Sequence, residues 1–462
     1  MDDFLRNVDS VNKTISRITW GPTTLIFVLF VGFWFSYRLN FFQFTKVRLW
    51  CSITFGSFLG KKKDIKSKKT RVSPLQAVST ALAGSVGTGN IVGVAVAVML
   101  GGPGALFWMW VAAILGMMTS FAENVLAVKY KEKDKNGYYY GGPMFYMEKA
   151  LDCKWLAMIF SVACIGVTFG MGNMIQSNSI ANSIHDSLGI SPLITGLITA
   201  AIAGIIVLGS IDRIIKVTDK LVPVMVGLYL IGGLLVILCN LDKLGEVMLR
   251  IIQSAFDFRP VGGSIVGCSA IGAMKYGISR GLFSNEAGLG SSPIVHATTD
   301  ITVPAVQGMW GIFQVFIDTI LVCSITGFCV LITGCDQTVK NPTTVTSTAF
   351  SSVLGNVGGV MVCIILIFFA FSTIIGWSYF GERCVSYLVG ERHIGIYKLS
   401  VPFVIVIGAT MNLELLWEIC DNLNVFMMVP NLLAILLLSK QVVALGQKAL
   451  NSKGGRDDEC RI

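Results

Sequence analysis

The sequence predicts an all-α polytopic membrane protein with eleven transmembrane helices. Of its 462 residues, 53% are hydrophobic and only 14% are charged, and the mean hydropathy is +0.70. Soluble globular domains usually contain about a quarter charged residues, so this composition indicates a chain surrounded by lipid. Apolar runs long enough to cross a bilayer, roughly 20 residues each, recur along the whole chain.

Eleven apolar runs define the expected membrane spans. They lie near residues 20–41, 73–100, 104–129, 154–181, 191–211, 217–240, 260–280, 303–333, 356–381, 395–412 and 416–439. The first run follows a mixed-charge segment and has no small-residue cleavage site. We therefore interpret it as a retained helix and not as a signal peptide.

Basic residues in the loops predict the orientation. The connection between Arg38 and Arg71 and the connection between Lys129 and Lys135 are rich in basic residues, whereas alternate connections, such as the one around His185, have almost none. Basic loops stay on the cytoplasmic side. We expect a cell-membrane protein with its N-terminus outside and its C-terminus inside. The net charge is +9, but the lysines and arginines lie mainly in short loops between apolar runs, so no basic face remains for a nucleic acid. We expect the lipid bilayer to be the partner of this chain.

Two glycine-rich stretches interrupt spans that lie five spans apart. The first is Gly84–Asn90, within the span at 73–100, and the second is Gly262–Gly272, within the span at 260–280. An offset of five spans inverts the second set of helices relative to the first. Interrupted helices in corresponding positions of two inverted halves are typical of secondary transporters with a midplane site.

This offset predicts the domain organisation. Residues 1–72 form an extracellular segment, the first helix and a basic cytoplasmic loop, outside a ten-helix core. The first repeat is 73–240 and the second is 260–440, and an extracellular amphipathic connection, 241–259, joins them. A cytoplasmic tail, 441–462, ends the chain.

The Gly84–Asn90 stretch has two possible roles. Backbone groups freed from a helix inside a bilayer are tolerated only where protein or a polar cavity satisfies them, which favours a binding site. The alternative is close helix packing through small residues. A nucleotide loop is excluded, because neither phosphate-binding glycine pattern is present.

Polar residues in two other spans are further candidates. Asn173 and Gln176 share a helical face with Phe169, and their amides either line a cavity or join helices. Ser372 and Thr373 offer hydroxyl oxygens to a hard cation, or bond back to their own helix. Trp377 forms either a wall of the site or part of the packing.

Few charges fall inside the spans. Glu123, Arg280 and Glu286 suggest a gate or a structural ion pair near the cytoplasmic ends, and Lys275 is a further charge in the same span as Arg280. Asp318 lies in mid-span and needs a partner or a proton.

Four motifs together resemble the alanine or glycine:cation symporter family of bacteria and archaea. They are Gly87–Asn90, Gly172–Gln176, Gly281–Pro293 and Phe371–Trp377. The resemblance covers nearly the whole chain. It implies a LeuT-type fold, with five plus five inverted repeats, two broken helices and one extra N-terminal helix. It also implies import of alanine or glycine with sodium by alternating access.

The resemblance implies a set of site residues. The substrate carboxylate would meet the backbone amides near Thr88 and Gly89, and its ammonium would meet carbonyls near Ile271 and Gly272 and the Gln176 amide oxygen. The implied substrate-binding residues are Thr88, Gly89, Asn90, Phe169, Asn173, Gln176, Ile271, Gly272 and Trp377. The implied sodium ligands are the carbonyls of Ala83 and Val86, a carbonyl near Phe368 or Phe369, and the hydroxyls of Ser372 and Thr373.

Other classes have less support. A proton-coupled transporter of another small neutral amino acid is the main alternative, and a gated channel is a weaker one. No nucleophile, base and orienting group stand out as for an enzyme. The three histidines are far apart, and the cysteines lack metal-ligand spacing, so we expect sodium as the only cofactor and no organic one.

The orientation is testable by labelling. Single cysteines placed between Lys61 and Lys69, in a background without accessible native cysteines, should react with an impermeant thiol reagent only from the cytoplasmic side. A matched cysteine at Asp186 should react only from outside. Labelling of the basic loop from outside would contradict both the topology and the inverted-repeat prediction.

Overall fold

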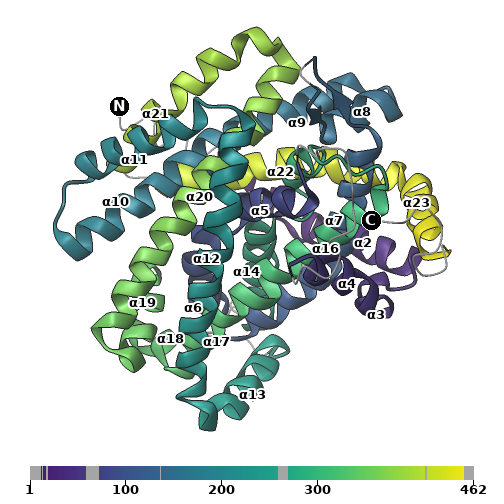
Figure 1. The fold of residues 1–462 in the computed structure, drawn as a ribbon. Coiled ribbons are helices and arrows are strands. Elements are labelled where there is room, and N and C mark those ends of the chain that lie inside the picture. The colour runs from purple at the N-terminus through teal and green to yellow at the C-terminus, as the bar shows by residue number, and fades with distance from the viewer. Residues whose placement is uncertain are drawn as a thin grey trace.

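The computed structural model describes residues 12, 14–16, 19–58, 72–135, 137–258, 269–411 and 414–451, which form a bundle of helices with one small hairpin (Figure 1). The predicted all-α class is confirmed for this part of the chain. The basic loop, the glycines from Gly262 to Gly267 and the tail beyond Asn451 lie outside the described residues.

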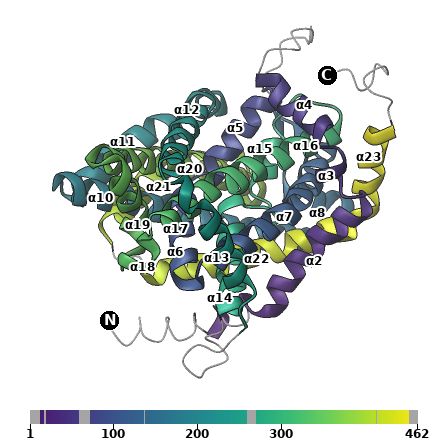
Figure 2. The ribbon, with the colours of Figure 1, turned by 90° about the horizontal axis from the view of Figure 1, so that it is seen from below.

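The N-terminal helices lie at one side of the bundle (Figure 2). They are α2 (Pro22–Arg38), α3 (Phe42–Thr45) and α4 (Val47–Phe58). Pro22 occupies the first turn of α2, where its missing N–H costs no hydrogen bond. Helix α2 buries Val28, Val31 and Phe35 against the bundle, while Ile26 and Phe30 face outward.

The first half of the core begins with a broken helix. Its elements are α5 (Pro74–Ser85), the π-helix η1 (Gly89–Gly93), α6 (Val94–Gly101), α7 (Gly104–Lys129), the hairpin strands β1 (Glu132–Lys133) and β2 (Tyr139–Tyr140), α8 (Pro143–Leu151), α9 (Lys154–Val167), the π-helix η2 (Thr168–Met174), α10 (Ile175–Leu188), α11 (Pro192–Val207) and α12 (Ile211–Leu238). Two short helices follow, η3 (Leu241–Lys243) and α13 (Leu244–Ala255). The strands are antiparallel, with Glu132 opposite Tyr140.

The second half also begins with a broken helix. It consists of α14 (Ser269–Asn285), α15 (Ser292–His296), α16 (Pro304–Val315), the π-helix η5 (Phe316–Cys323), α17 (Ser324–Ile332), α18 (Cys335–Thr338), α19 (Pro342–Leu354), α20 (Asn356–Val389), η6 (Glu391–His393), α21 (Ile394–Thr410), α22 (Glu414–Leu437) and α23 (Ser439–Asn451). Each half contains a broken helix, two long spans, a shorter span and a final long span. This order is what an inverted repeat predicts, and the repeat boundaries stay a prediction.

Seven helices within the described ranges are long and apolar enough to cross a membrane, or eight if the bent pair α5 and η1–α6 is one span. Helices α2 and α11 are apolar but shorter. The multi-span class is therefore confirmed, and the count of eleven stays a prediction.

Helix α20 packs against α5, α9, α10 and α12 and lies next to α10 and α12 in Figure 1. Its middle turns, from Phe369 to Phe380, are almost entirely buried. Helix α11, at the side, exposes Leu193, Ile194 and Leu197. Large apolar side chains on an outer face are suited to contact with lipid. The buried polar groups lie around α20 instead.

Candidate functional site

The first break lies at the residues that the sequence indicates. Helix α5 ends at Ser85, Val86 is extended, and the π-helix η1 starts at Gly89, so the two halves meet at 56°. The side chain of Asn90 holds this turn, because its Oδ1 accepts the Gly87 N–H at 2.9 Å. The predicted interruption of this span at Gly84–Asn90 is therefore present in the structure.

Most of the second predicted interruption, from Gly262 to Gly267, lies outside the described residues, so only its end at Gly272 is tested. Helix α14 runs without interruption from Ser269 to Asn285, so Gly272 lies in a regular helix and the chain does not break at that end. The chain unwinds at 286–291, where Glu286, Gly288 and Gly290 have φ values of 58°, 93° and 80°. Glycine adopts this left-handed region without strain, whereas Gly272 has ordinary helical geometry.

The two breaks lie side by side. A Cβ atom on Gly89 would lie 3.2 Å from the ring of Phe283 and 3.6 Å from the Cα of Ser284. Gly89 begins the second half of the first broken helix, and Ser284 comes just before the second break. Two sets of backbone groups released from helices therefore face one buried region.

Gln176 and Thr373 are the predicted residues that approach the first break most directly. Gln176 Oε1 accepts the Thr88 N–H at 3.4 Å, and its amide nitrogen donates to the Met171 carbonyl at 3.1 Å. Gly87 has no side chain, and a Cβ there would meet the Thr373 hydroxyl. The structure therefore brings Thr88, Gly89, Asn90 and Gln176 together, with Thr373 beside them.

Three other candidates lie where η2 packs against α20 and α21. Asn173 donates to the Thr168 carbonyl at 2.7 Å and accepts from the Ser378 hydroxyl at 3.3 Å. The Phe169 ring packs against Tyr397, with centroids 5.6 Å apart. Trp377 is fully buried and reaches the second break, because its Nε1 donates to Glu286 at 2.9 Å.

Ile271 and Gly272 lie apart from this group. Ile271 is 45% exposed, and the Gly272 carbonyl lies beside Gly101 at the far end of α6. Twelve helical residues separate Ile271 from Phe283, which corresponds to about 18 Å along the axis. Their assignment to the substrate stays a prediction that this arrangement does not support.

The predicted sodium ligands lie where α5 packs against α20. Ser372 and Thr373 both donate to the Phe369 carbonyl, at 2.9 and 3.0 Å. A Cβ atom on Gly376 would lie 2.8 Å from the Gly84 nitrogen, so the end of α5, including Ala83, runs along this face of α20. Hydroxyls that donate to a carbonyl keep their oxygen lone pairs available for a cation.

Three carboxylates are fully buried near the breaks. Glu123 accepts from the Gly290 N–H and from Asn431, and Glu286 accepts from Ser291 and Trp377. Asp318 accepts from Asn90. Within the described part of the chain, none of the three has an ion-pair partner. Asn431 donates to both Glu123 and the Gly288 carbonyl. No motif in the sequence predicts this role of Asn431.

Arg280 is not part of this group. It pairs with Asp421 at 3.4 Å, so the expected grouping of Arg280 with Glu123 and Glu286 is wrong.

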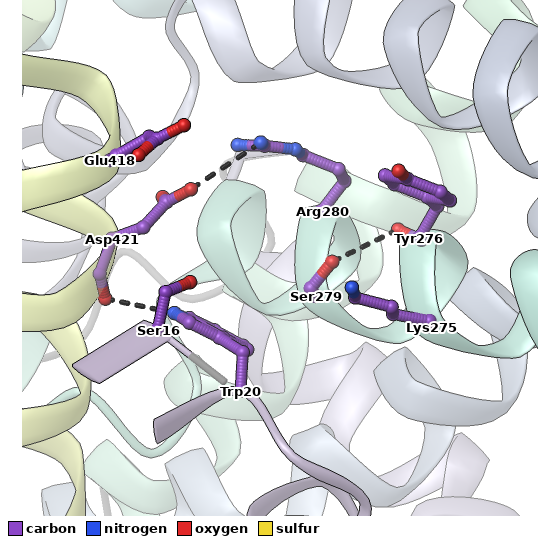
Figure 3. A pocket seen from close by; sticks show the side chains of 8 residues that line it. All are labelled: Ser16, Trp20, Lys275, Tyr276, Ser279, Arg280, Glu418 and Asp421. Atoms are coloured by element: carbon purple, nitrogen blue, oxygen red, sulfur yellow. Dashed lines mark hydrogen bonds and ion pairs between the residues drawn. The ribbon is translucent and has the colours of Figure 1, made fainter. Parts of the chain in front are cut away.

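A pocket of about 360 Å³ surrounds this ion pair (Figure 3). It is lined by Ser16, Trp20, Lys275, Tyr276, Ser279, Arg280, Glu418 and Asp421. Arg280 also lies over the rings of Phe283 and Trp417, which stack on each other at 5.7 Å. Because Phe283 contacts Gly89, the aromatic pair separates the pocket from the first break.

On the other side of the breaks, the hairpin β1–β2 is tied to the loop after α15. Lys131 donates to the Thr299 and Ile301 carbonyls and lies 4.1 Å from the centre of the Tyr139 ring. Burial lowers the pKa of Lys131 to about 8. Asp300 N donates to the Val72 carbonyl, just before α5, so this contact links both broken helices.

These features define a membrane-spanning helical transporter in which two broken helices meet at a buried polar region. A crystal structure of a mutant manganese transporter from Eremococcus coleocola has the same fold, with a TM-score of 0.59 at 14% identity over 81% of each chain. Comparison with known sequences identifies the family.

The chain belongs to the sodium:alanine symporter family, whose profile matches residues 5–459. It is 40% identical over 450 residues to the sodium/alanine symporter AgcS of Methanococcus maripaludis, and the match covers 96% of each chain. It is 42% identical over 442 residues to an uncharacterized transporter of Haemophilus influenzae, covering 94% of this chain and 95% of that one. The family resemblance is confirmed: the protein is a multi-pass transporter and not an enzyme.

Glycine substitutions distinguish the two broken regions. Gly89→Leu should lower the uptake of labelled alanine by at least about tenfold, because Phe283 would have to move and overpacking costs roughly 1–3 kcal/mol. Gly272→Leu is the matched control, since no described residue lies within 4 Å of a Cβ there, and uptake should change by less than about twofold. An equal loss of uptake in both variants would indicate that Gly272 lines the substrate path.

Proposed function

We propose that this protein imports alanine or glycine together with sodium by alternating access. The observation that carries the proposal is the first break: a turn at Val86–Thr88, closed by Asn90 and contacted by Gln176, in the fully buried centre of the bundle.

The chemistry of the break suits an amino acid. The Thr88 hydroxyl is buried and has no hydrogen-bond partner among the residues that the structure describes, an arrangement that costs free energy unless a ligand satisfies it. The positive end of the half-helix η1–α6 begins at Gly89, so a substrate carboxylate is favoured there. Gln176 Oε1 accepts from Thr88 through a long contact of 3.4 Å and is a suitable acceptor for a substrate ammonium.

The surroundings favour a small side chain. Phe283 contacts the position of Gly89, and Thr373 contacts that of Gly87, so bulky groups enclose the turn on two sides. Alanine and glycine need little space beyond their charged groups. The archaeal relative named as a sodium/alanine symporter supports the same choice.

The arrangement of α5 and α20 favours sodium as the coupling ion. Carbonyls freed near Ala83 and Val86 and the hydroxyls of Ser372 and Thr373 are neutral oxygen ligands on two adjoining elements. Neutral oxygens suit a monovalent hard cation, whereas a divalent ion prefers several carboxylates. Binding of the ion would hold the unwound segment against α20 and so favour the substrate-binding geometry.

Alternating access requires the breaks to be closed from each side in turn. The aromatic pair Phe283 and Trp417 with the Arg280–Asp421 ion pair closes one side, and the Lys131 contacts close the other. Ser16 and Trp20 of the N-terminal segment, which we assign to the outside, line the pocket around this ion pair. The proposal therefore puts Arg280 toward the outer side, in contrast to the sequence expectation of a position near a cytoplasmic end.

The ion site predicts a specific defect. Purified protein in liposomes should take up labelled alanine when sodium is present outside, and not with lithium or choline. Replacing both hydroxyls, Ser372→Ala with Thr373→Val, should raise the sodium concentration for half-maximal uptake about tenfold or more, because two ligands are lost. The alanine concentration for half-maximal uptake at saturating sodium should change far less.

Ser378→Ala is the control for the ion site, because its hydroxyl lies on the same helix but bonds to Ile374 and Asn173. Sodium-independent uptake by the wild-type protein would contradict sodium coupling. An unchanged sodium requirement in the double variant would exclude the proposed ion ligands.

The substrate site predicts a binding defect. Gln176→Ala should weaken alanine binding about fivefold to tenfold in a folded protein, since one hydrogen bond contributes roughly 1 kcal/mol. Asn182→Ala, which removes an exposed amide on the same helix whose partner among the described residues is Asn178, should bind alanine normally. Calorimetry of both variants at saturating sodium measures the difference. Equal affinities would reassign Gln176 to helix packing.

A further inference from the structure

Two buried carboxyl groups bond to consecutive residues of the second break. Glu123 on α7 accepts the Gly290 N–H at 3.1 Å, and Glu286 accepts from the Ser291 hydroxyl. Both glutamates are 0% exposed, and the proposed function uses neither of them. An acidic side chain buried in a membrane protein without a cation beside it usually serves an ion or a proton.

Glu123 has the hydrogen bonds of a neutral acid. Its Oε1 accepts both the Gly290 N–H and the Asn431 amide, whereas its Oε2 has no hydrogen-bond partner among the described residues. An ionised carboxylate would leave negative charge on this bare, buried oxygen, which costs more free energy than a bare hydroxyl. The group is therefore protonated in this structure, with its proton on Oε2.

Glu286 has the hydrogen bonds of an ionised carboxylate. Its Oε1 accepts from Trp377 Nε1 at 2.9 Å and its Oε2 accepts from Ser291, so each oxygen faces a donor. Glu286 begins the unwound segment with a φ of 58°, which is uncommon for a residue with a bulky side chain. Such backbone geometry is concentrated at functional sites. The pair therefore combines one carboxylate with one acid.

Glu123 lies toward the side of the breaks that carries the hairpin β1–β2. Asn431, which donates to Glu123, accepts from the Tyr146 hydroxyl on α8. A Cβ atom on Gly290 would lie 2.7 Å from Pro143, the first residue of α8, and α8 follows strand β2 directly. Movement of α8 away from the second break would therefore admit water to Glu123, and water favours the ionised form.

The titratable neighbours of the pair supply no positive charge. Those that interact with it electrostatically are neutral or acidic, namely Tyr146 on α8, Cys164 on α9 and Asp318 on η5. His296 on α15 lies between the amides of Gln307 and Gln314.

The cations of the adjoining elements have other partners. The two lysines at the end of α7 bond to neutral oxygens, Lys129 to Gln441 and Lys131 to the carbonyls of Thr299 and Ile301. The two arginines pair with carboxylates outside this group, Arg280 with Asp421 and Arg383 with Glu382. A proton on Glu123 is therefore what reduces the charge of the pair.

We propose that Glu123 is a proton-binding site that couples proton movement to the second break, with Glu286 as the fixed negative charge beside it. The inference rests on the proposed alternating-access function and adds a proton to its coupled ions. The bond that forms and breaks is the O–H bond at Glu123 Oε2. Water delivers the proton when the site is open to one side and takes it up when the hairpin side opens, and no electrons are transferred.

The closed state explains why a proton is needed. With the proton bound, the glutamate pair carries a single negative charge, and the Gly290 N–H and Asn431 can hold Glu123 in a dry environment. Without the proton, the second break would enclose two carboxylates and no cation among the described residues. Closure of the break therefore favours the protonated form.

Proton movement with alanine tests this proposal. The purified full-length protein in liposomes, with equal sodium on both sides, should take up alanine down its gradient and acidify the lumen, as a trapped pH indicator reports. In Glu123→Gln, the alanine uptake that remains should cause no acidification above that of protein-free liposomes, because an amide of the same shape releases no proton. Glu246→Gln, which removes an exposed carboxyl on α13, should acidify the lumen like the wild type.

Infrared spectroscopy provides a second readout that does not need transport, because Glu123→Gln can also slow uptake. The purified wild-type protein at neutral pH should show the C=O stretch of a buried carboxylic acid. The difference spectrum between the wild type and Glu123→Gln should contain this band, and the difference spectrum between the wild type and Glu246→Gln should not.

The two readouts separate the possible failures. Alanine uptake by the wild type without acidification would overturn the proton site and leave the proposed function standing. Acidification that persists in Glu123→Gln, or a carboxylic acid band that this variant retains in full, would also overturn it. A wild type that takes up no alanine would contradict the proposed function, whereas loss of the band in Glu123→Gln would still support a proton at Glu123.

Discussion

The site depends on one constraint: backbone groups released by a break inside a membrane protein must find partners in the protein itself. Side chains provide them at the first break. Asn90 accepts the Gly87 N–H, Thr326 donates to the Asn90 carbonyl at 2.7 Å, and Thr346 donates to the Ile91 carbonyl at 3.3 Å. These partners come from distant helices, so the break is stable only when the whole bundle is assembled.

The same constraint explains why small residues and polar residues occur together. Close approach at Gly84 and Gly376 lets α5 run directly along α20, and the missing side chain of Gly87 leaves room for the Thr373 hydroxyl. Packing through small residues and the creation of a binding site are therefore not alternatives here. The close contact places freed carbonyls beside hydroxyls, which is the geometry that a cation needs.

Both broken helices contribute to one mechanism because their partners are shared. Glu286 at the second break bonds to Trp377 on the same helix that carries Ser372 and Thr373. Asp318 accepts from both breaks. In the proposed function, a ligand bound at either break would change hydrogen bonds at the other, and this would give ion and substrate a physical route for coupling.

The sequence by itself determined the class, most of the spans, the first break and the hydroxyl pair, because composition, apolar length and a dense glycine run are local properties. Only the tertiary structure decided which partners meet. Arg280 pairs with Asp421 and not with a glutamate, Phe169 turns to Tyr397, and Asn90 joins Asp318, which is 228 residues away. The position of the second break also depends on the tertiary structure. Glycine occurs both in a regular helix, as at Gly272, and in an unwound turn, as at Gly288, so packing against neighbouring helices decides where the chain unwinds.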